Sequence, residues 1–373
     1  MDLEILFVKT SSLGDIIQSF HALAQLKRFF PSAKVDWVVE KSFAPLVAAH
    51  PFVRDVIEVD FRSWKKKIFS ATSWTSLFSQ IKRLRKRRYD LLFDLQGNTK
   101  SGFLSLCSRA QSKVGFGPKS VREWPNLLAT QKRFETDLKQ NICLQYASLI
   151  ERYFSIESQP ITPFRLSISP EEKVALSTLP FKDAHFRVMV CPGSQWKNKQ
   201  LEPTALQQLL QRMEKELTAS FLLVWGNDQE RMLCVDLKKQ LVHAHVVEKL
   251  SLPAWQNLMW EVDLLIGVDS SALHLCSTTP TPTFSIFGPT SANIYKPEGK
   301  NHFSVQGACP YQVRFEKVCP RLRTCPTGAC IRTLSGDALF QELQNRYCHK
   351  ELKVAATKLE RSSLSLPSSS SLD

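Results

Sequence analysis

The sequence predicts an α/β fold made of two doubly wound domains. Strand-like apolar runs alternate with helix-like stretches in each half of the 373 residues, and a segment rich in proline and serine separates the two series. Such alternation favours parallel sheets with helices on both faces, and the length is sufficient for two separate cores. We therefore predict an N-terminal domain at residues 1–165 and a C-terminal domain at residues 166–350.

The first half begins with a strand, a turn and a helix. Residues 4–10, EILFVKT, form the nearly continuous apolar run that is typical of a buried parallel strand. Over residues 15–31 the apolar residues recur at close to helical spacing, and this pattern ends at Pro31. Further strands, with helical patterns between most of them, are predicted at residues 34–40, 55–60, 90–96 and 113–117.

The second half repeats this alternation after a predicted linker. Residues 155–185 contain a stretch with three prolines and several serines, which favours a linker. The following strands are predicted at residues 186–194, 220–227, 244–250, 263–271 and 281–290. The tail, residues 351–373, ends in SSLSLPSSSSLD and is predicted to be largely disordered.

The charge indicates an acidic partner. The net charge is +14, and much of the excess lies in RSWKKK (residues 62–67) and IKRLRKRR (residues 81–88). Nucleic acid, an anionic membrane or an acidic small molecule would each fit. No recognisable nucleic-acid-binding module is present, so we expect no nucleic-acid partner. The second basic run is either a solvated helix face or a membrane contact.

Two further features bear on the compartment. The chain contains no run of 18 apolar, uncharged residues, so a spanning helix is not expected. Its N-terminus lacks the basic start, apolar stretch and cleavage site of a signal peptide. We therefore expect a cytoplasmic protein.

Polar residues collect where the predicted strands end. Parallel sheets bind ligands beyond the carboxyl ends of their strands, so two such sheets predict an active site in the cleft between them. After the first strand, VKTSSLGDIIQSF places Lys9, Ser11, Ser12, Gly14 and Asp15 in one turn. Two interpretations are open: Asp15 caps the helix and the others are solvated loop residues, or the turn carries chemistry.

The loops of the second half carry a similar set of groups. They contain Ser194, Lys197 and Lys199, then Asp228 and Glu230, and then Asp269, Ser270, Ser271 and His274. Hydroxyl and N–H groups at a helix start suit phosphate, a lysine adds a point charge, and a carboxylate suits ribose hydroxyls. The alternative interpretation makes them helix caps, a core histidine and solvated lysines. Neither GxxxxGK[ST] nor GxGxxG occurs.

These motifs, in this order, resemble the ADP-heptose:lipopolysaccharide heptosyltransferases of glycosyltransferase family 9, most closely the heptosyltransferase I branch. The similar segments are VKTSSLGDIIQSFHAL, VDWVVEKSFA, FRSWKKKIFSA, DLQGNTKSG, GVDSSALHL and IFGPTSA, between about Leu3 and Gly288. The resemblance implies a GT-B fold, with the acceptor on the N-terminal domain and the nucleotide sugar on the other. It also implies inverting transfer of heptose from ADP-heptose to the Kdo region of the lipopolysaccharide inner core, without metal or cofactor. The acceptor would be Kdo-lipid A, and the enzyme would lie peripherally on the cytoplasmic, anionic face of the inner membrane.

The resemblance also implies roles for individual residues. Asp15 matches the catalytic base, and Lys199 matches a lysine that neutralises the departing diphosphate. The nucleotide-sugar set comprises Ser194, Gln195, Lys199, Glu230, Leu250, Asp269, Ser270, Ser271 and His274. The acceptor set comprises Ser11, Ser12, Gly14, Arg62, Lys65 and Arg122.

The sequence departs from the family pattern at three points. Ser271 replaces a frequent glycine, and Pro203 lies later than the family proline, so Lys197 competes with Lys199. Four late cysteines (Cys309, Cys319, Cys325 and Cys330) follow a C-x9-C-x5-C-x4-C spacing. Without a CxxC pair this spacing is a poor match to a zinc ribbon; reduced thiols, a metal site and a disulfide remain open. Cysteines also occur here in the family's other branch, so a heptosyltransferase II-like acceptor or another nucleotide sugar is the alternative.

Overall fold

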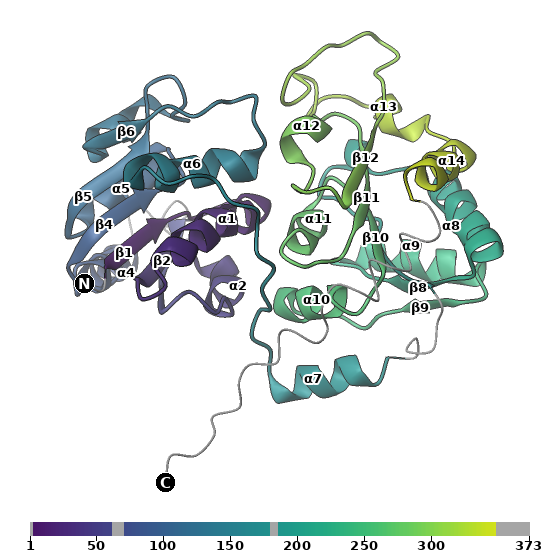
Figure 1. Ribbon diagram of the computed structural model, residues 1–373, viewed down its shortest axis with the longest axis horizontal. Helices are drawn as coiled ribbons and strands as arrows, with labels where there is room; N and C mark the ends of the chain where they lie inside the picture. The colour runs from purple at the N-terminus through teal and green to yellow at the C-terminus, as the bar shows by residue number, and fades with distance from the viewer. Residues whose placement is uncertain (1–2, 62–70, 180–185, 348–373) are drawn as a thin grey trace.

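The computed structural model describes residues 3–61, 71–179 and 186–347, and it contains two parallel six-stranded sheets (Figure 1). Arg62, Lys65 and the predicted tail lie outside the described residues. The strands of the first sheet are β1 (Glu4–Val8), β2 (Lys34–Glu40), β3 (Asp55–Val59), β4 (Tyr89–Asp94), β5 (Ala110–Phe116) and β6 (Lys132–Phe134). Those of the second are β7 (Phe186–Cys191), β8 (Ala219–Leu223), β9 (Ala244–Val246), β10 (Leu264–Val268), β11 (Thr283–Phe287) and β12 (His302–Gln306).

Both sheets have the same topology. Their strand orders are β3-β2-β1-β4-β5-β6 and β12-β11-β10-β7-β8-β9, which become identical when the second is read from β9. This is the doubly wound dinucleotide-fold order, and its switch point lies between the two central strands. The predicted α/β class is confirmed. The short strand β6 and the last strand β12 were not predicted from the sequence.

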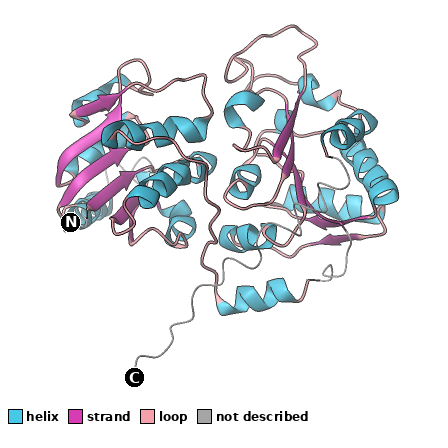
Figure 2. Cartoon of the chain, in the orientation of Figure 1, coloured by secondary structure: helices cyan, strands magenta, loops and turns pink. Residues whose placement is uncertain are grey.

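Helices cover the faces of both sheets (Figure 2). The helices of the first half are α1 (Leu13–Phe29), η1 (Lys41–Phe43), α2 (Ala44–Ala48), α4 (Ala71–Leu84), α5 (Thr99–Cys107), η2 (Trp124–Ala129) and α6 (Ile142–Phe154). Those that follow are α7 (Pro170–Ser177), η3 (Lys197–Lys199), α8 (Pro203–Leu217), α9 (Asp228–Lys239), α10 (Leu252–Met259), α11 (Ser271–Cys276), α12 (Ala292–Tyr295), α13 (Ala329–Arg332) and α14 (Gly336–Arg346).

Strand β1 shows why its sequence is apolar at every position from Ile5 to Val8. Ile5 and Phe7 belong to the core cluster that also contains α1 and α6 residues, whereas Leu6 and Val8 belong to the cluster on the opposite face of the sheet. Successive side chains of a strand point to opposite faces. A strand that is covered on both faces must therefore be apolar throughout.

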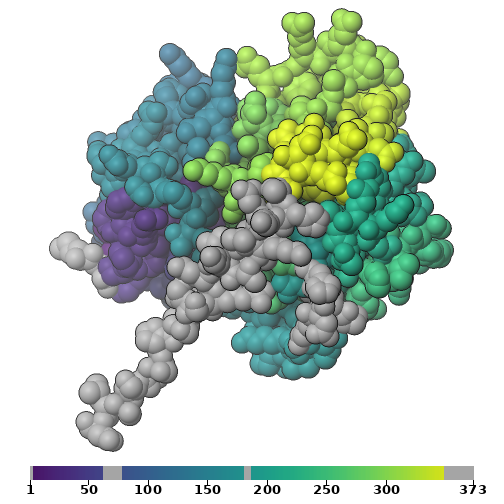
Figure 3. All heavy atoms as spheres, turned by 45° about the vertical axis from the view of Figure 1, so that its right-hand side comes forward, coloured from purple at the N-terminus to yellow at the C-terminus, as the bar shows by residue number. Residues whose placement is uncertain are grey.

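The two halves are joined by a continuous core and by the connecting segment, and Figure 3 shows them as adjacent blocks of colour. Buried apolar residues of α1 and α6 form one cluster with those of α10 and α11. In the connector, the backbone N–H of Phe164 donates to the carbonyl of Thr278, and that of Ser167 donates to the carbonyl of Ala49. The predicted linker therefore contacts both halves.

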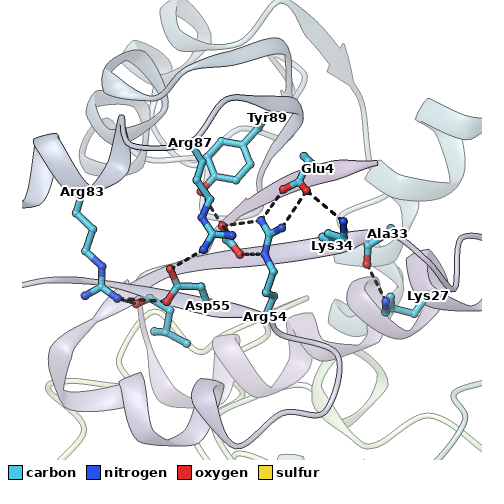
Figure 4. Close-up of polar contacts among 11 residues, drawn as sticks. Glu4, Lys27, Ala33, Lys34, Arg54, Asp55, Arg83, Arg87 and Tyr89 are labelled. Atoms are coloured by element: carbon cyan, nitrogen blue, oxygen red, sulfur yellow. Dashed lines mark hydrogen bonds and ion pairs between the residues drawn. The ribbon is translucent and has the colours of Figure 1, made fainter. Parts of the chain in front are cut away.

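An ion-pair network lies at the amino ends of β1, β2 and β3, away from the carboxyl ends where ligands are expected (Figure 4). The fully buried carboxylate of Asp36 accepts two hydrogen bonds from Arg54, at 2.8 and 3.0 Å. It also accepts one from the Tyr89 hydroxyl at 2.9 Å. Arg83 and Arg87 reach the same region through Asp55. Part of the basic run 81–88 is thus used in intramolecular pairs.

Candidate active site

A cleft of 1040 Å³ lies between the two halves, and loops after β1, β4, β7 and β10 contribute to its lining. Its position agrees with the rule that ligands bind beyond the carboxyl ends of parallel strands. The predicted site residues that line it are Ser12, Gly14, Asp15, Arg122, Ser194, Gln195, Lys199, Glu230, Asp269, Ser270, Ser271 and His274. The structure therefore brings together polar groups that lie far apart in the sequence.

Asp15 lies in the first turn of α1 with its carboxylate held from both sides. Helix α1 begins at Leu13 with Ser12 as the N-cap, so Asp15 is the third helical residue and not the N-cap itself; its carboxylate completes a capping box with Ser12. Oδ2 accepts hydrogen bonds from the Ser12 N–H at 3.1 Å and the Ser12 hydroxyl at 2.7 Å. Oδ1 accepts one from the Tyr146 hydroxyl at 2.9 Å. These contacts orient the carboxylate at the cleft wall.

A buried lysine, Lys9, contacts the tyrosine that holds the Asp15 carboxylate. Lys9 is 1% exposed, so its interpretation as a solvated loop residue is wrong. Its ammonium donates to the Tyr146 hydroxyl at 2.9 Å and to the Leu95 carbonyl at 3.1 Å. The result is a chain of hydrogen bonds from Lys9 through Tyr146 to Asp15.

The charges in this chain determine the ionisation of Asp15. Burial alone would raise the pKa of the Asp15 carboxyl, but the Lys9 charge and the hydrogen bonds from Ser12 and Tyr146 outweigh it and lower the pKa to about 2. Burial lowers the pKa of Lys9 to about 8, against the opposing charge of Asp15. At neutral pH the pair is therefore an ammonium and a carboxylate.

The opposite wall of the cleft is organised by Asp269, which is 6% exposed. Its Oδ2 accepts hydrogen bonds from the Lys199 ammonium and from the Thr290 hydroxyl, each at 2.6 Å. Its Oδ1 lies 3.4 Å from Nε2 of His274. Burial would raise the pKa of this carboxyl, but the His274 hydrogen bond and the Lys199 charge lower it overall. Asp269 therefore positions a lysine and a histidine at the cleft surface.

The two walls meet at His274. The amide Nε2 of Gln18, on α1, lies 3.2 Å from both ring nitrogens of His274, on α11. A Cβ atom on Gly14 would lie 3.1 Å from Cδ2 of the same ring. Glycine at position 14 thus permits the close approach that joins the turn after β1 to the opposite half.

Two further groups of the second half face the cleft. Glu230 is the third residue of α9; its Oε2 accepts from the Gly226 N–H at 2.7 Å and its Oε1 from Asn227 at 2.8 Å. The arrangement parallels that of Asp15, since both carboxylates reach back toward the start of their helix. The hydroxyl of Ser270, at the N-cap of α11, is buried without a hydrogen-bond partner. It is available to a ligand.

Comparison with known proteins agrees with this architecture. The family model described as glycosyltransferase family 9 (heptosyltransferase) matches residues 77–324. The chain belongs to glycosyltransferase family 9. It is therefore a glycosyltransferase, as the motifs predicted.

Relatives of this family 9 enzyme align along most of its length. It is 29% identical to lipopolysaccharide heptosyltransferase 1 of Pseudomonas aeruginosa over 322 residues, which cover 85% of this chain and 87% of the relative. It is 24% identical to lipopolysaccharide heptosyltransferase 1 of Escherichia coli K12, with 80% and 92% covered. These similarities agree with the predicted branch.

Solved structures share its fold. The E. coli heptosyltransferase WaaC with ADP superposes with a TM-score of 0.75 at 23% identity, covering 92% of this chain and all of the other. The E. coli ADP-heptose heptosyltransferase II gives a TM-score of 0.67 at 17% identity, covering 94% and 100%. The predicted GT-B fold is thereby confirmed.

Some predicted site residues of the glycosyltransferase do not line the cleft. The N–H of Ser11 donates to Gln96 at 3.2 Å, which ties this residue to the end of β4 while Ser12 reaches the cleft. Leu250 packs against the hydrophobic core, and Leu252, two residues later, lines the cleft instead. Lys197 is exposed outside the cleft, whereas Lys199 lines it.

Several cleft residues were not predicted as site residues: Lys9, Gln18, Tyr146, Thr290 and Lys317. Lys9 lies in the opening motif, which is the one local signal that could have identified it. Tyr146 and Lys317 lie in segments without a recognisable site motif, and only the fold brings them near Asp15.

The four late cysteines of the glycosyltransferase lie around one cavity. Cys309, Cys319, Cys325 and Cys330 all line a 390 Å³ cavity next to the loop that follows β12. They are free thiols. Burial, together with the charges of the other three cysteines, raises the pKa of the Cys330 thiol to about 11. Within the described residues, no group of three or more His, Cys, Asp or Glu side chains is arranged to hold a metal ion.

Proposed function

We propose that the protein transfers heptose from ADP-heptose to the Kdo region of the lipopolysaccharide inner core. The observation that carries the proposal is one cleft with an ionised aspartate on its N-terminal wall and a lysine–aspartate–histidine group on its C-terminal wall. Relatives named lipopolysaccharide heptosyltransferase 1 and a WaaC structure that contains ADP-2-deoxy-2-fluoro heptose support the choice of sugar.

In this mechanism Asp15 is the general base of an inverting displacement. The acceptor hydroxyl oxygen bonds to the anomeric carbon from the face opposite the diphosphate, the bond to the diphosphate oxygen breaks, and Asp15 takes the hydroxyl proton. A carboxylate with a pKa of about 2 is a weak base. It fits a late proton transfer, because the hydroxyl proton becomes acidic only as the new C–O bond forms.

The C-terminal wall would bind the nucleotide and stabilise the leaving diphosphate. Lys199 supplies positive charge where the diphosphate charge develops, and the hydroxyls of Ser194 and Ser270 supply hydrogen bonds. Asp269 keeps Lys199 and His274 in place; its carboxylate is ionised and accepts hydrogen bonds, so it has no proton to donate to phosphate. Glu230 is assigned to the ribose hydroxyls. We propose no metal or cofactor in this step.

The N-terminal wall would bind the acceptor. Ser12, Gly14 and Arg122 line this side of the cleft, and Lys317 faces it from the other half. Burial lowers the pKa of Lys317, and the nearby Asp15 charge opposes this effect. Arginine and lysine side chains here suit the carboxylate of a Kdo sugar. Arg62 and Lys65 keep their proposed acceptor role as residues outside the described part of the chain.

The acceptor would be Kdo-lipid A at the cytoplasmic face of the inner membrane, with the enzyme bound peripherally. Within the described residues, no helix is long and apolar enough to cross a bilayer. The net charge of +14 supports binding to an anionic surface.

The test is the Asp15→Asn variant, assayed with ADP-heptose and a Kdo-bearing lipid A. Asparagine preserves the size of the side chain and an acceptor for Tyr146, but it cannot take a proton at neutral pH. We expect a modestly lower Tm, because the buried Lys9 loses the Asp15 charge, together with retained ADP binding and a rate that is about 100-fold or more lower, within the range for loss of a general base. Transfer near the wild-type rate together with a lowered Tm would show that Asp15 only stabilises the helix start.

A further inference from the structure

An exposed apolar surface lies where α5 packs against η2. A Cβ on Gly102 would come within 3.2 Å of Cα of Asn126, so the two elements are in direct contact. At one end, Glu123 accepts hydrogen bonds from the N–H of Thr99 at 2.9 Å and from its hydroxyl at 2.6 Å. Four large side chains remain exposed along this junction: Phe103 (41%), Leu106 (56%), Trp124 (67%) and Leu128 (69%).

These four residues, called here the apolar patch, lie on two elements that contact each other. Phe103 and Leu106 are three residues apart and therefore share a face of α5. Trp124 and Leu128 belong to the adjacent η2, on either side of its contact with Gly102. Large apolar side chains that gather on a surface mark an interaction site, whereas single ones do not.

The segment that carries the patch is strongly basic. Between residues 99 and 133 the sequence contains seven lysines and arginines and a single acidic residue, Glu123, which is held by Thr99. Arg133 donates to the carbonyl of Leu127 at 2.7 Å and so lies beside Leu128. Apolar side chains on a segment with an excess of positive charge complement a bilayer with anionic headgroups, since the surface attracts the charges and the acyl boundary accepts the apolar groups.

The patch also borders the acceptor end of the cleft. Val121 and Arg122 line the cleft and are followed, after Glu123, by Trp124 at the start of η2. A bilayer in contact with the patch would therefore lie next to the wall that carries Asp15. The basic run 81–88 is a weaker candidate for the membrane contact, because Arg83 and Arg87 already pair with carboxylates at the other end of the sheet.

We propose that the apolar patch docks this enzyme onto an anionic phospholipid bilayer, so that a lipid-anchored acceptor sugar enters the cleft from the membrane. The inference rests on the proposed function in one respect: it takes the acceptor to be held in the bilayer by acyl chains.

The first experiment measures binding of the full chain to vesicles of mixed phosphatidylglycerol and phosphatidylcholine, and to vesicles of phosphatidylcholine alone. We expect binding to the anionic vesicles that weakens with salt, and a loss of about tenfold or more in Leu128→Ser. The matched control is Val242→Ser, which also removes an exposed apolar side chain (82%) but lies in the other half; it should bind like the wild type.

The second experiment compares turnover of the acceptor in vesicles with turnover of the same sugar without acyl chains. Leu128→Ser should lose rate only with the vesicle-bound acceptor. Equal vesicle binding by Leu128→Ser and the wild type would overturn the proposal, as would an equal loss in Val242→Ser. It would also be overturned if the substitution changed only the oligomeric state of lipid-free protein, because the patch would then join two copies. Failure of the wild type to use either acceptor would refute the proposed function, while vesicle binding would still test the docking surface.

Discussion

Substitution of Lys199 by methionine separates the proposed catalytic role of this lysine from its structural role. Methionine keeps an apolar side chain of similar length but removes the ammonium that lies 2.6 Å from Oδ2 of Asp269. The side chains of Lys199 and Asp269 are 14% and 6% exposed, so the substitution leaves a nearly buried carboxylate without its closest cation. Two measurable losses should follow.

The first loss is stability. Removing one partner of a buried ion pair costs about 3–5 kcal/mol. Asp269 keeps the hydroxyl of Thr290 at 2.6 Å and the His274 ring at 3.4 Å, so we expect the lower end of that range. At about 2–4 °C of Tm per kcal/mol for 150–250 residues, thermal denaturation should show a clear decrease.

The second loss is rate. A donor that stabilises developing negative charge contributes about 10²–10³-fold to kcat, so Lys199→Met should fall by that factor in an assay of ADP release. Lys197→Met is the matched control, because Lys197 is exposed in the same short helix, η3, and does not line the cleft. It should change neither Tm nor kcat.

A double variant completes the test. Lys199→Met/Asp269→Asn removes the unpaired charge, so it should recover much of the Tm while kcat stays low. Recovery of kcat together with Tm would show that Lys199 acts only through stability. Loss of activity in Lys197→Met with retention in Lys199→Met would show that the wrong lysine was assigned.

Three further predictions concern the hydrogen-bond chain, the remote ion pairs and a buried histidine. Tyr146→Phe removes a hydrogen bond to the charged Asp15 carboxylate. Such a bond contributes about 1.5–3 kcal/mol, which corresponds to roughly 1–2 pKa units, so the pKa of Asp15 should rise from about 2. A pH–rate profile whose acid limb does not move to higher pH would contradict this. Asp36→Ala leaves Arg54 without its buried acceptor and should cost about 3–5 kcal/mol in the free energy of unfolding, whereas a changed KM for the donor would contradict its place at the remote end of the sheet. Burial lowers the pKa of His50 from 6.5 to about 3. Below pH 6.5 the His50 side chain therefore binds a proton in the unfolded chain but not in the folded chain, and the free energy of unfolding should fall toward pH 3. The Tm of His50→Phe should fall less over the same pH range, and equal decreases in the two proteins would exclude this cause.

Local patterns in the sequence determined the fold class and much of the cleft. Apolar runs identified most strands of both sheets, because a strand covered on both faces must be apolar at every position. Polar residues just after those runs were placed correctly in the cleft, since the carboxyl ends of parallel strands lie along one edge of a sheet. Asp15, Ser194 and Asp269 were found in this way.

The tertiary structure decided which groups touch each other. Tyr146 meets Asp15 across 131 residues of sequence, and Lys199 meets Asp269 across 70, so no local periodicity could reveal either contact. The burial of Lys9 depends on elements that pack over the end of β1. The choice between Lys199 and Lys197 depends on a short helix, η3, that turns only one of them into the cleft. Sequence periodicity reports which face of an element is buried, whereas contacts between distant side chains depend on how the two sheets and their helices pack together.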